Sequence, residues 1–105
     1  MTDLQIEVMR HGAEVALSGR LDARSATVAR TLLHDLLDDG DGDLLLHVGG
    51  LEIRDAAGLG VLIGSHRKAR QLDRRLVLTD VPLRQLRLLR ATRLHRVLTL
   101  EPAVA

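Results

Sequence analysis

The sequence predicts an α/β fold with a mixed, mostly parallel sheet of about four to five strands and about three packed helices. Three observations support this prediction. Apolar and polar residues alternate near the amino terminus, which is typical of a half-buried hairpin. Short apolar runs follow, and segments with apolar residues at helical spacing separate them. Strands that alternate with helices along a chain usually pair in parallel through right-handed crossovers.

Length and composition predict one domain that spans residues 1–105. Hydrophobic residues make up 46% and charged residues 28% of the chain, which is the balance of a globular protein. Phe, Tyr and Trp are absent, so the core must be aliphatic. The absence of Cys excludes a disulfide framework and thiolate chemistry. Because no apolar stretch is long enough to cross a bilayer, we expect a cytoplasmic protein without membrane insertion.

The amino-terminal third predicts a hairpin and a helix. Leu4–Met9 and Ala13–Ser18 alternate as two strands, and residues 10–12 supply the turn between them. Ala23–Leu37 has apolar residues at helical spacing, including Val28. Asp22 directly precedes this segment and is expected to be its N-cap.

The middle of the chain predicts a loop, a central strand and a second helix. Residues 38–43 alternate Asp and Gly, which is typical of a loop; a calcium loop is not favoured, because a strand-like run follows instead of a helix. That run, Leu44–Val48, is almost wholly apolar, as expected for a strand covered on both faces. Asp55 then caps a helix over Ala56–Gln71.

The last third predicts a strand, a helix and a short closing strand. Leu76–Leu78 reads as the strand. Val81-Pro82 opens a helix that runs to about Ala91, because Pro is favoured in a first turn. Leu94–Leu100 is expected to form a turn and a terminal strand.

Charge is distributed unevenly along the chain. Residues 1–55 contain 11 acidic and 5 basic residues, whereas residues 56–105 contain 3 acidic and 10 basic ones. Folding could interleave these halves into a surface of mixed sign, or it could leave a polarised face that attracts a charged partner. The sequence leaves both interpretations open.

The sharpest local feature is the strand-to-helix junction at residues 53–60. The first-turn amides of a helix have no intrahelical partners and attract anions. Asp55 would cap those amides, and the small residues after it would let another surface approach. Two segments here, Leu17-Ser18-Gly19-Arg20-Leu21-Asp22 and Asp55-Ala56-Ala57-Gly58-Leu59-Gly60, resemble the L-x-G-x-L-D and D-S-[S/T]-G-L-G motifs of the STAS-domain anti-sigma factor antagonists of bacteria.

The resemblance covers nearly the whole chain and implies a STAS fold and a regulatory function. In that family an ATP-binding anti-sigma factor, itself a serine kinase, binds the antagonist and releases its sigma factor. The kinase phosphorylates the Ser after the motif's Asp, and the added charge ends binding. This sequence has Ala56 at that position and Ala57 beside it, so the usual switch cannot be phosphorylated. The partner-binding residues implied by the resemblance are Asp22, Arg54, Asp55, Ala56, Ala57, Gly58 and Leu59.

An alternative from another class is a STAS regulatory subunit of a transporter or signalling assembly, which could sense a small ligand at the same helix end. The sequence does not predict an enzyme, a metal site or a cofactor, since its five His are scattered and no nucleophile motif or P-loop is present. Nucleic-acid binding is not favoured, because the Arg residues from Arg84 to Arg96 spiral around a helix and no aromatic residue can stack on bases. The sequence leaves open whether the protein forms a homodimer.

Overall fold

The computed structural model describes residues 3–103, which form one five-stranded sheet with the strand order β1-β2-β3-β4-β5. The strands are β1 (Gln5–Arg10), β2 (Glu14–Leu21), β3 (Asp43–Ile53), β4 (Arg75–Val81) and β5 (Thr99–Pro102). The helices are α1 (Ala26–Asp38), α2 (Ala56–Gln71), α3 (Leu83–Ala91) and the 3₁₀ turn η1 (Leu94–Arg96). Only β1 runs antiparallel to its neighbour, so the predicted mixed, mostly parallel sheet is confirmed.

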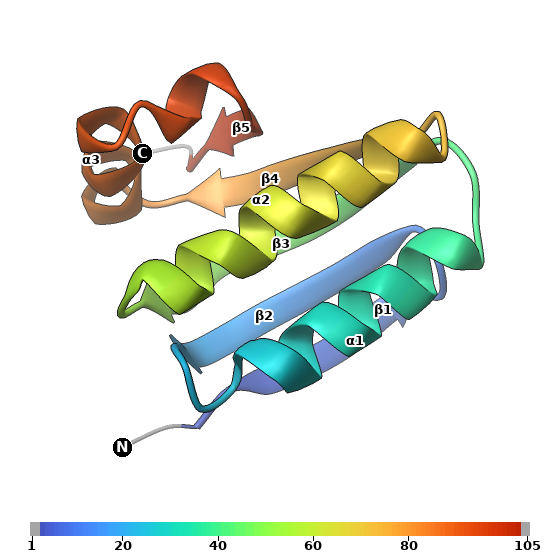
Figure 1. The fold of residues 1–105 in the computed structure, drawn as a ribbon, viewed down its shortest axis with the longest axis horizontal. Helices are drawn as coiled ribbons and strands as arrows, with labels where there is room; N and C mark the ends of the chain where they lie inside the picture. The colour runs from blue at the N-terminus through green and yellow to red at the C-terminus, as the bar shows by residue number, and fades with distance from the viewer. Residues whose placement is uncertain (1–2, 104–105) are drawn as a thin grey trace.

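Two helices cover one face of this sheet. α1 and α2 lie side by side on it and contact each other (Figure 1). The strands β2, β3 and β4 end on the same side of the molecule, where the loops leading into α1, α2 and α3 also lie (Figure 1). We call this side the carboxyl edge, and the side where these three strands begin the amino edge.

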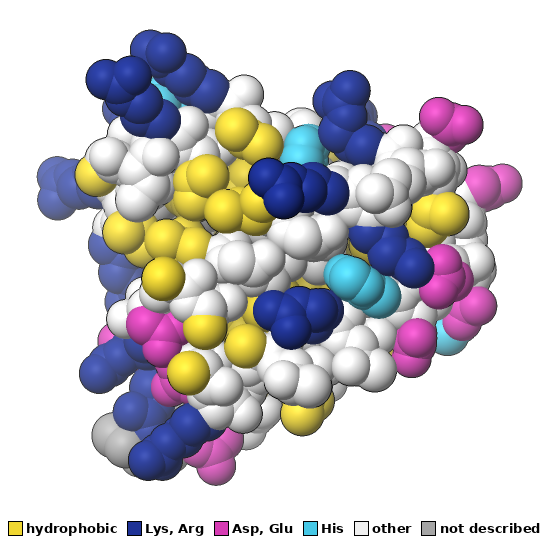
Figure 2. Space-filling model, viewed as in Figure 1, with side chains coloured by type: hydrophobic (Ala, Val, Ile, Leu, Met, Phe, Trp, Pro, Cys, Tyr) yellow, Lys and Arg dark blue, Asp and Glu magenta, His cyan; other side chains and the backbone are white. Residues whose placement is uncertain are grey.

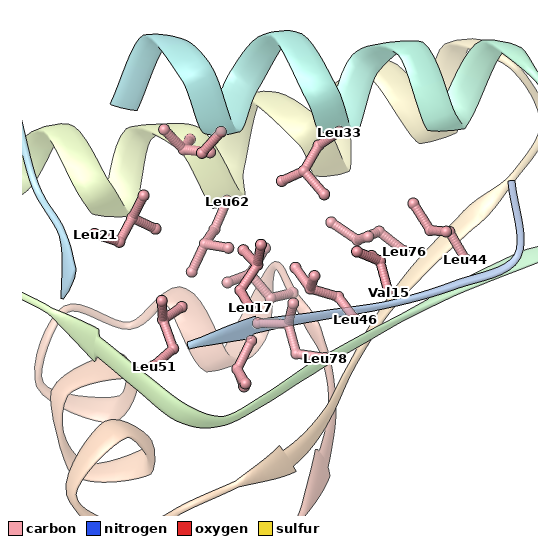
Figure 3. Close-up of a cluster of buried hydrophobic side chains, with 14 of the residues drawn as sticks. Val15, Leu17, Leu21, Leu33, Leu44, Leu46, Leu51, Leu62, Leu76 and Leu78 are labelled. Atoms are coloured by element: carbon pink, nitrogen blue, oxygen red, sulfur yellow. The ribbon is translucent and has the colours of Figure 1, made fainter. Parts of the chain in front are cut away.

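The hydrophobic cluster between the sheet and the two helices is built from aliphatic side chains. Leucines from β2, β3, β4, α1 and α2 converge there, and most are completely buried (Figure 3). A Leu or Val side chain contributes roughly 1.5–3 kcal/mol when it is fully buried, so this cluster is the main source of stability. The expectation for Val28 was wrong: its side chain is 63% exposed, because the buried stripe of α1 runs through Ala29, Leu33 and Leu36 instead.

Strand β3 is longer than predicted because a β-bulge accommodates its two glycines. Ala16 pairs with His47, but Ser18 pairs with Gly50, so β3 has one more residue than β2 in this interval. The strand therefore continues past Val48 and buries Leu51. The bulge also interrupts the alternation of buried and exposed residues along β3, since the buried residues Val48 and Leu51 are three positions apart instead of two.

The start of α1 also differs from the prediction. The N-cap is Ser25 rather than Asp22, and residues 22–25 form a separate turn. The Asp22 carboxylate accepts hydrogen bonds from the amides of Arg24 (2.9 Å) and Ser25 (3.4 Å), both within that turn. Asp22 therefore stabilises the approach to the helix rather than its first turn.

A buried arginine stabilises the amino edge. Arg74 is 5% exposed, and its guanidinium donates to the carbonyls of Leu36 (3.1 Å) and Leu37 (2.8 Å) in the last turn of α1. It also donates to the carbonyls of Gly12 and Gly42, in the hairpin turn and the acidic loop. One guanidinium group thus donates hydrogen bonds to carbonyls at the C-terminal end of α1 and links that end to two loops.

Candidate functional site

The carboxylate of Asp55 connects the two segments that carry the sequence motifs. One oxygen accepts a hydrogen bond from the amide of Gly58 at 3.0 Å, which makes Asp55 the N-cap of α2 as predicted. The other oxygen accepts from the amide of Ala23, also at 3.0 Å, in the turn before α1. These amides, Gly58 first and Ala23 second, lower the pKa of the Asp55 carboxyl, so the cap is ionised at neutral pH.

The turn before α1 is held by its own hydrogen bonds. The amide of Asp22 donates to the hydroxyl of Ser25 at 3.1 Å, and that hydroxyl donates to the carbonyl of Arg20 at 3.0 Å. This turn therefore presents the Ala23 amide to Asp55 in a fixed position. Asp22 and Asp55 lie at the same edge, and Ala23 links them without direct contact between the two carboxylates.

Gly58 is required by packing inside the molecule. A Cβ at this position would lie 2.6 Å from the carbonyl oxygen of Leu21, which is backbone and cannot move aside easily. We expected Gly58 and Gly60 to leave room for an approaching surface. For Gly58 the structure gives a different reason, because it lets α2 start against the end of β2, whereas Gly60 faces open space.

The exposed part of this site is small and uncharged. Ala56 is exposed at the first position of α2, Ala57 is half-buried, and Leu59 packs partly against the core. A side chain that replaced the Ala56 methyl would project from the protein surface at the end of a helix. Ala56, Ala57 and Leu59 form a shallow, uncharged surface next to the Asp55 carboxylate, which we call the rim of α2. Such a surface suits contact with another protein.

Arg54 lies apart from this rim. Its guanidinium pairs with Glu52 at 2.8 Å and lines a hollow together with Arg20 and Arg84. The prediction did not include Arg20 or Arg84. Alternation along β2 places Arg20 on the face opposite Leu17 and Leu21, but no local signal in the sequence brings Arg84 of α3 next to it.

The charge distribution is only partly polarised. Figure 2 shows Lys and Arg side chains concentrated along the carboxyl-edge side and also over the middle of this face, whereas Asp and Glu side chains occur at both ends, with more of them toward the amino edge. Arg20, Arg54 and Arg84 line one hollow at the carboxyl edge, whereas the acidic loop at residues 38–43 precedes β3 at the amino edge.

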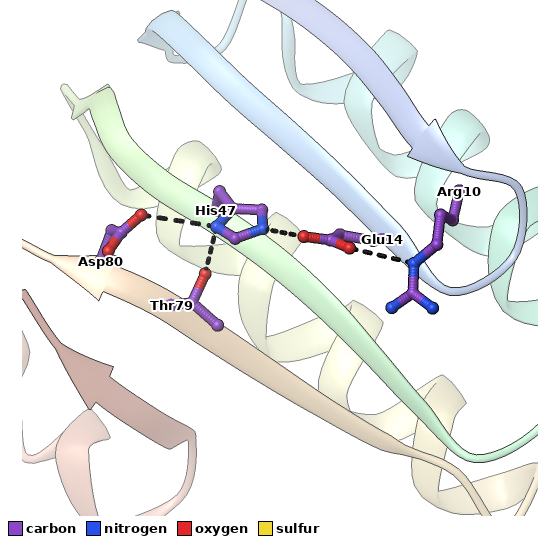
Figure 4. Close-up of polar contacts among 5 residues, drawn as sticks. All are labelled: Arg10, Glu14, His47, Thr79 and Asp80. Carbon is purple, nitrogen blue, oxygen red and sulfur yellow. Dashed lines mark hydrogen bonds and ion pairs between the residues drawn. The ribbon is translucent and has the colours of Figure 1, made fainter.

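A polar network crosses the sheet face that α1 and α2 do not cover. His47 of β3 lies between Glu14 of β2 at 2.6 Å and Thr79 of β4 at 2.7 Å, with Asp80 at 3.4 Å and Arg10 beyond Glu14 (Figure 4). The hydrogen bond to Glu14 raises the pKa of His47, and the same bond lowers the pKa of Glu14. The network therefore carries charges of both signs near neutral pH.

Two absences within residues 3–103 bear on the kind of site that is present. They contain no group of three or more His, Asp or Glu side chains arranged to hold a metal ion. No helix in this range has the length and apolar character needed to cross a membrane.

Comparisons with known proteins identify a matching family model and several solved structures with a similar fold. The family model described as "Mlab, STAS domain" matches residues 5–101. A candidate anti-sigma factor antagonist from Thermotoga maritima superposes with a TM-score of 0.75 at 19% identity, covering 96% of this chain and 87% of that one. An anti-sigma factor antagonist from Mycobacterium paratuberculosis gives 0.73 at 19% identity, with coverage of 97% and 86%.

A third similar structure is the anti-sigma factor antagonist SpoIIAA of Bacillus in its unphosphorylated form. It gives a TM-score of 0.69 at 16% identity and covers 97% of this chain and 90% of that one. No curated protein sequence matches the chain significantly. At identities below 20% the structural similarity establishes the fold.

Proposed function

The chain belongs to the STAS domain family, and on this premise we propose that it is an anti-sigma factor antagonist. Residues 1–105 would form one domain that binds an ATP-binding anti-sigma factor of the serine kinase type in the bacterial cytoplasm. Binding would release the sigma factor and so regulate transcription, without any enzymatic activity of this chain. The proposed binding residues are Asp22, Arg54, Asp55, Ala56, Ala57, Gly58 and Leu59.

The arrangement around Asp55 is the observation that supports this proposal. Its carboxylate joins the start of α2 to the turn before α1, so both motifs that resemble the family contribute to one continuous surface. Ala56 is exposed beside this junction, where the family carries its phosphorylated Ser. A phosphoserine adds roughly −1.5 to −2 charges at pH 7, and a methyl group cannot acquire them. We therefore infer an antagonist that this kinase reaction cannot inactivate.

The proposal is tested by calorimetric titration against ATP-binding anti-sigma factors, with ATP and with ADP. We expect saturable binding by the natural chain, and binding at least about tenfold weaker by Ala56→Asp, because a charge enters the interface. An acidic residue in the first turn of α2 is favourable for the helix, so the fold should tolerate this variant. Ala91→Asp, at an exposed position of α3, is the matched control and should bind normally.

A second variant tests the lost switch. Ala56→Ser should incorporate phosphate from ATP in the presence of the cognate anti-sigma factor, and the phosphorylated product should bind weakly. Equal affinities of Ala56→Asp and the natural chain would move the interface away from α2. Absence of binding to every anti-sigma factor would contradict the antagonist function and favour the regulatory-subunit alternative.

A further inference from the structure

A second site lies at the carboxyl edge, on the sheet face opposite α1 and α2. It is a hollow of about 400 Å³ between the ends of β2 and β3 and the start of α3. This volume falls within the roughly 300–1,000 Å³ of small-molecule pockets. The lining residues are Ser18, Gly19, Arg20, Gly50, Glu52, Arg54 and Arg84.

The hollow has an excess of positive charge. Its lining includes three arginines and one glutamate, which gives a net charge of +2. Glu52 pairs with Arg54 at 2.8 Å. Within residues 3–103, no carboxylate lies within ion-pair distance of Arg20 or Arg84, so neither guanidinium group is paired with an acidic side chain there.

The backbone around the hollow leaves room for a ligand. Gly19 has a φ of 85°, a conformation that L side chains rarely adopt, and it brings backbone to the wall without a side chain. Gly50 follows the β-bulge, and a Cβ there would lie 3.2 Å from that of Ser18. Bulges often redirect side chains next to binding sites. Here the bulge lies between His47 and Gly50, directly before the β3 residues that line the hollow.

We propose that this hollow binds a small phosphate monoester. A monoester carries roughly −1.5 to −2 charges at pH 7, which matches the net charge of the lining. Arginine donates paired hydrogen bonds to phosphate oxygens, and the Ser18 hydroxyl lies in the same wall as a further donor. The remaining volume accommodates the organic part of the ligand. The hollow shares Arg54 with the proposed docking surface, but its other lining residues lie outside that surface, and the test below uses Arg20 and Arg84.

Glycerol 3-phosphate is the probe for this proposal, titrated into the ¹⁵N-labelled chain and followed by amide chemical shifts. We expect saturable shifts at the amides of Gly19 and Gly50. Arg20→Ala and Arg84→Ala should each raise the Kd by about tenfold or more, because each removes a charge-assisted hydrogen bond. Arg90→Ala, at an exposed position of the same helix α3 outside the lining, is the matched control and should keep the natural Kd.

Two further titrations define the ligand chemistry. Glycerophosphocholine, a diester with one negative charge on its phosphate, should bind more weakly than the monoester, and the monoester should bind more weakly at pH 5.5 than at pH 7.5, because its second pKa is about 6. Inorganic phosphate shows how much the organic part contributes. Non-saturating shifts, or an Arg90→Ala effect as large as that of Arg84→Ala, would reject a defined site. The spectra also report whether each variant is folded.

Discussion

The two edges of the sheet use arginine in opposite ways. At the amino edge, Arg74 is buried and its donors are occupied by carbonyls of α1 and of two loops. At the carboxyl edge, Arg20 and Arg84 line an open hollow and have no carboxylate partner within residues 3–103. A charge whose hydrogen bonds are satisfied inside the molecule stabilises the fold, whereas an unsatisfied one at the surface is available to a ligand. The comparison thus separates a structural arginine from two arginines that are free to contact the proposed ligand.

Replacing the buried Arg74 should have the largest effect on the free energy of unfolding. Arg74→Ala removes the side-chain donor from the buried carbonyls of Leu37 and Gly12, and each unsatisfied buried group costs about 1–3 kcal/mol. We expect a loss of about 3 kcal/mol or more in the free energy of unfolding, a large part of the roughly 5–15 kcal/mol available to a domain. Urea denaturation measures this loss.

The neighbouring residue supplies the control for this prediction. Arg75 pairs with Asp43 at 2.7 Å, but its side chain is 63% exposed, and exposed pairs contribute little. Arg75→Ala should therefore leave the urea midpoint nearly unchanged. Similar midpoints for the two variants would mean that the carbonyl contacts of Arg74 do not stabilise the fold, and the contrast between the edges would be lost.

The stability of the carboxyl edge should depend on close backbone packing instead of on a buried charge. Gly58→Ala places a Cβ against the Leu21 carbonyl, so we expect a loss of about 1–3 kcal/mol from steric strain. Gly60→Ala, one half-turn later in the same helix and facing open space, should instead stabilise by about 0.5–1 kcal/mol, because Ala is the better helix former. Thermal unfolding of both variants measures the two effects. Equal changes in Tm would show that helix propensity alone acts here.

The comparison also shows which features the sequence predicts. Periodicity predicts the strands and helices, and it places α2 at Ala56–Gln71 with Asp55 as its cap, because these signals are local. It does not distinguish Arg74 from Arg75, since the partners of Arg74 are carbonyls more than 30 residues away. Periodicity also does not predict that Arg84 lies near Arg20, because these two residues are far apart in the sequence. Ser25 replaces Asp22 as N-cap because of a turn that composition alone does not predict.

His47 combines features of the buried and the unpaired arginines. Its imidazole pairs with a carboxylate inside the molecule, but it carries a positive charge only over part of the pH range. Its raised pKa means that the stability it contributes is present below its unfolded value near 6.5 and is lost as the pH rises through the folded value. Glu14 has a lowered pKa, so its contribution is present above its unfolded value near 4.5 and is lost in acid. Together the pair stabilises most between about pH 4.5 and 6.5, the unfolded values of Glu14 and His47, and the stabilisation declines as the pH rises from there through the folded pKa of His47.

The prediction is that His47→Gln lowers the Tm by a few degrees at pH 6 and by less at pH 8.5. The charges that face His47 are those of Glu14 and Asp80, with Arg10 beyond Glu14, and only Glu14 is close enough to dominate. Glu14→Gln should reproduce this pH dependence, and the double variant should show little additional loss because the two residues act as one pair. Thermal scans of all three variants across this pH range measure the coupling. A Tm difference that is constant with pH would mean that the pKa of His47 does not change on folding, so that its contacts with Glu14 and Thr79 do not favour the charged imidazole.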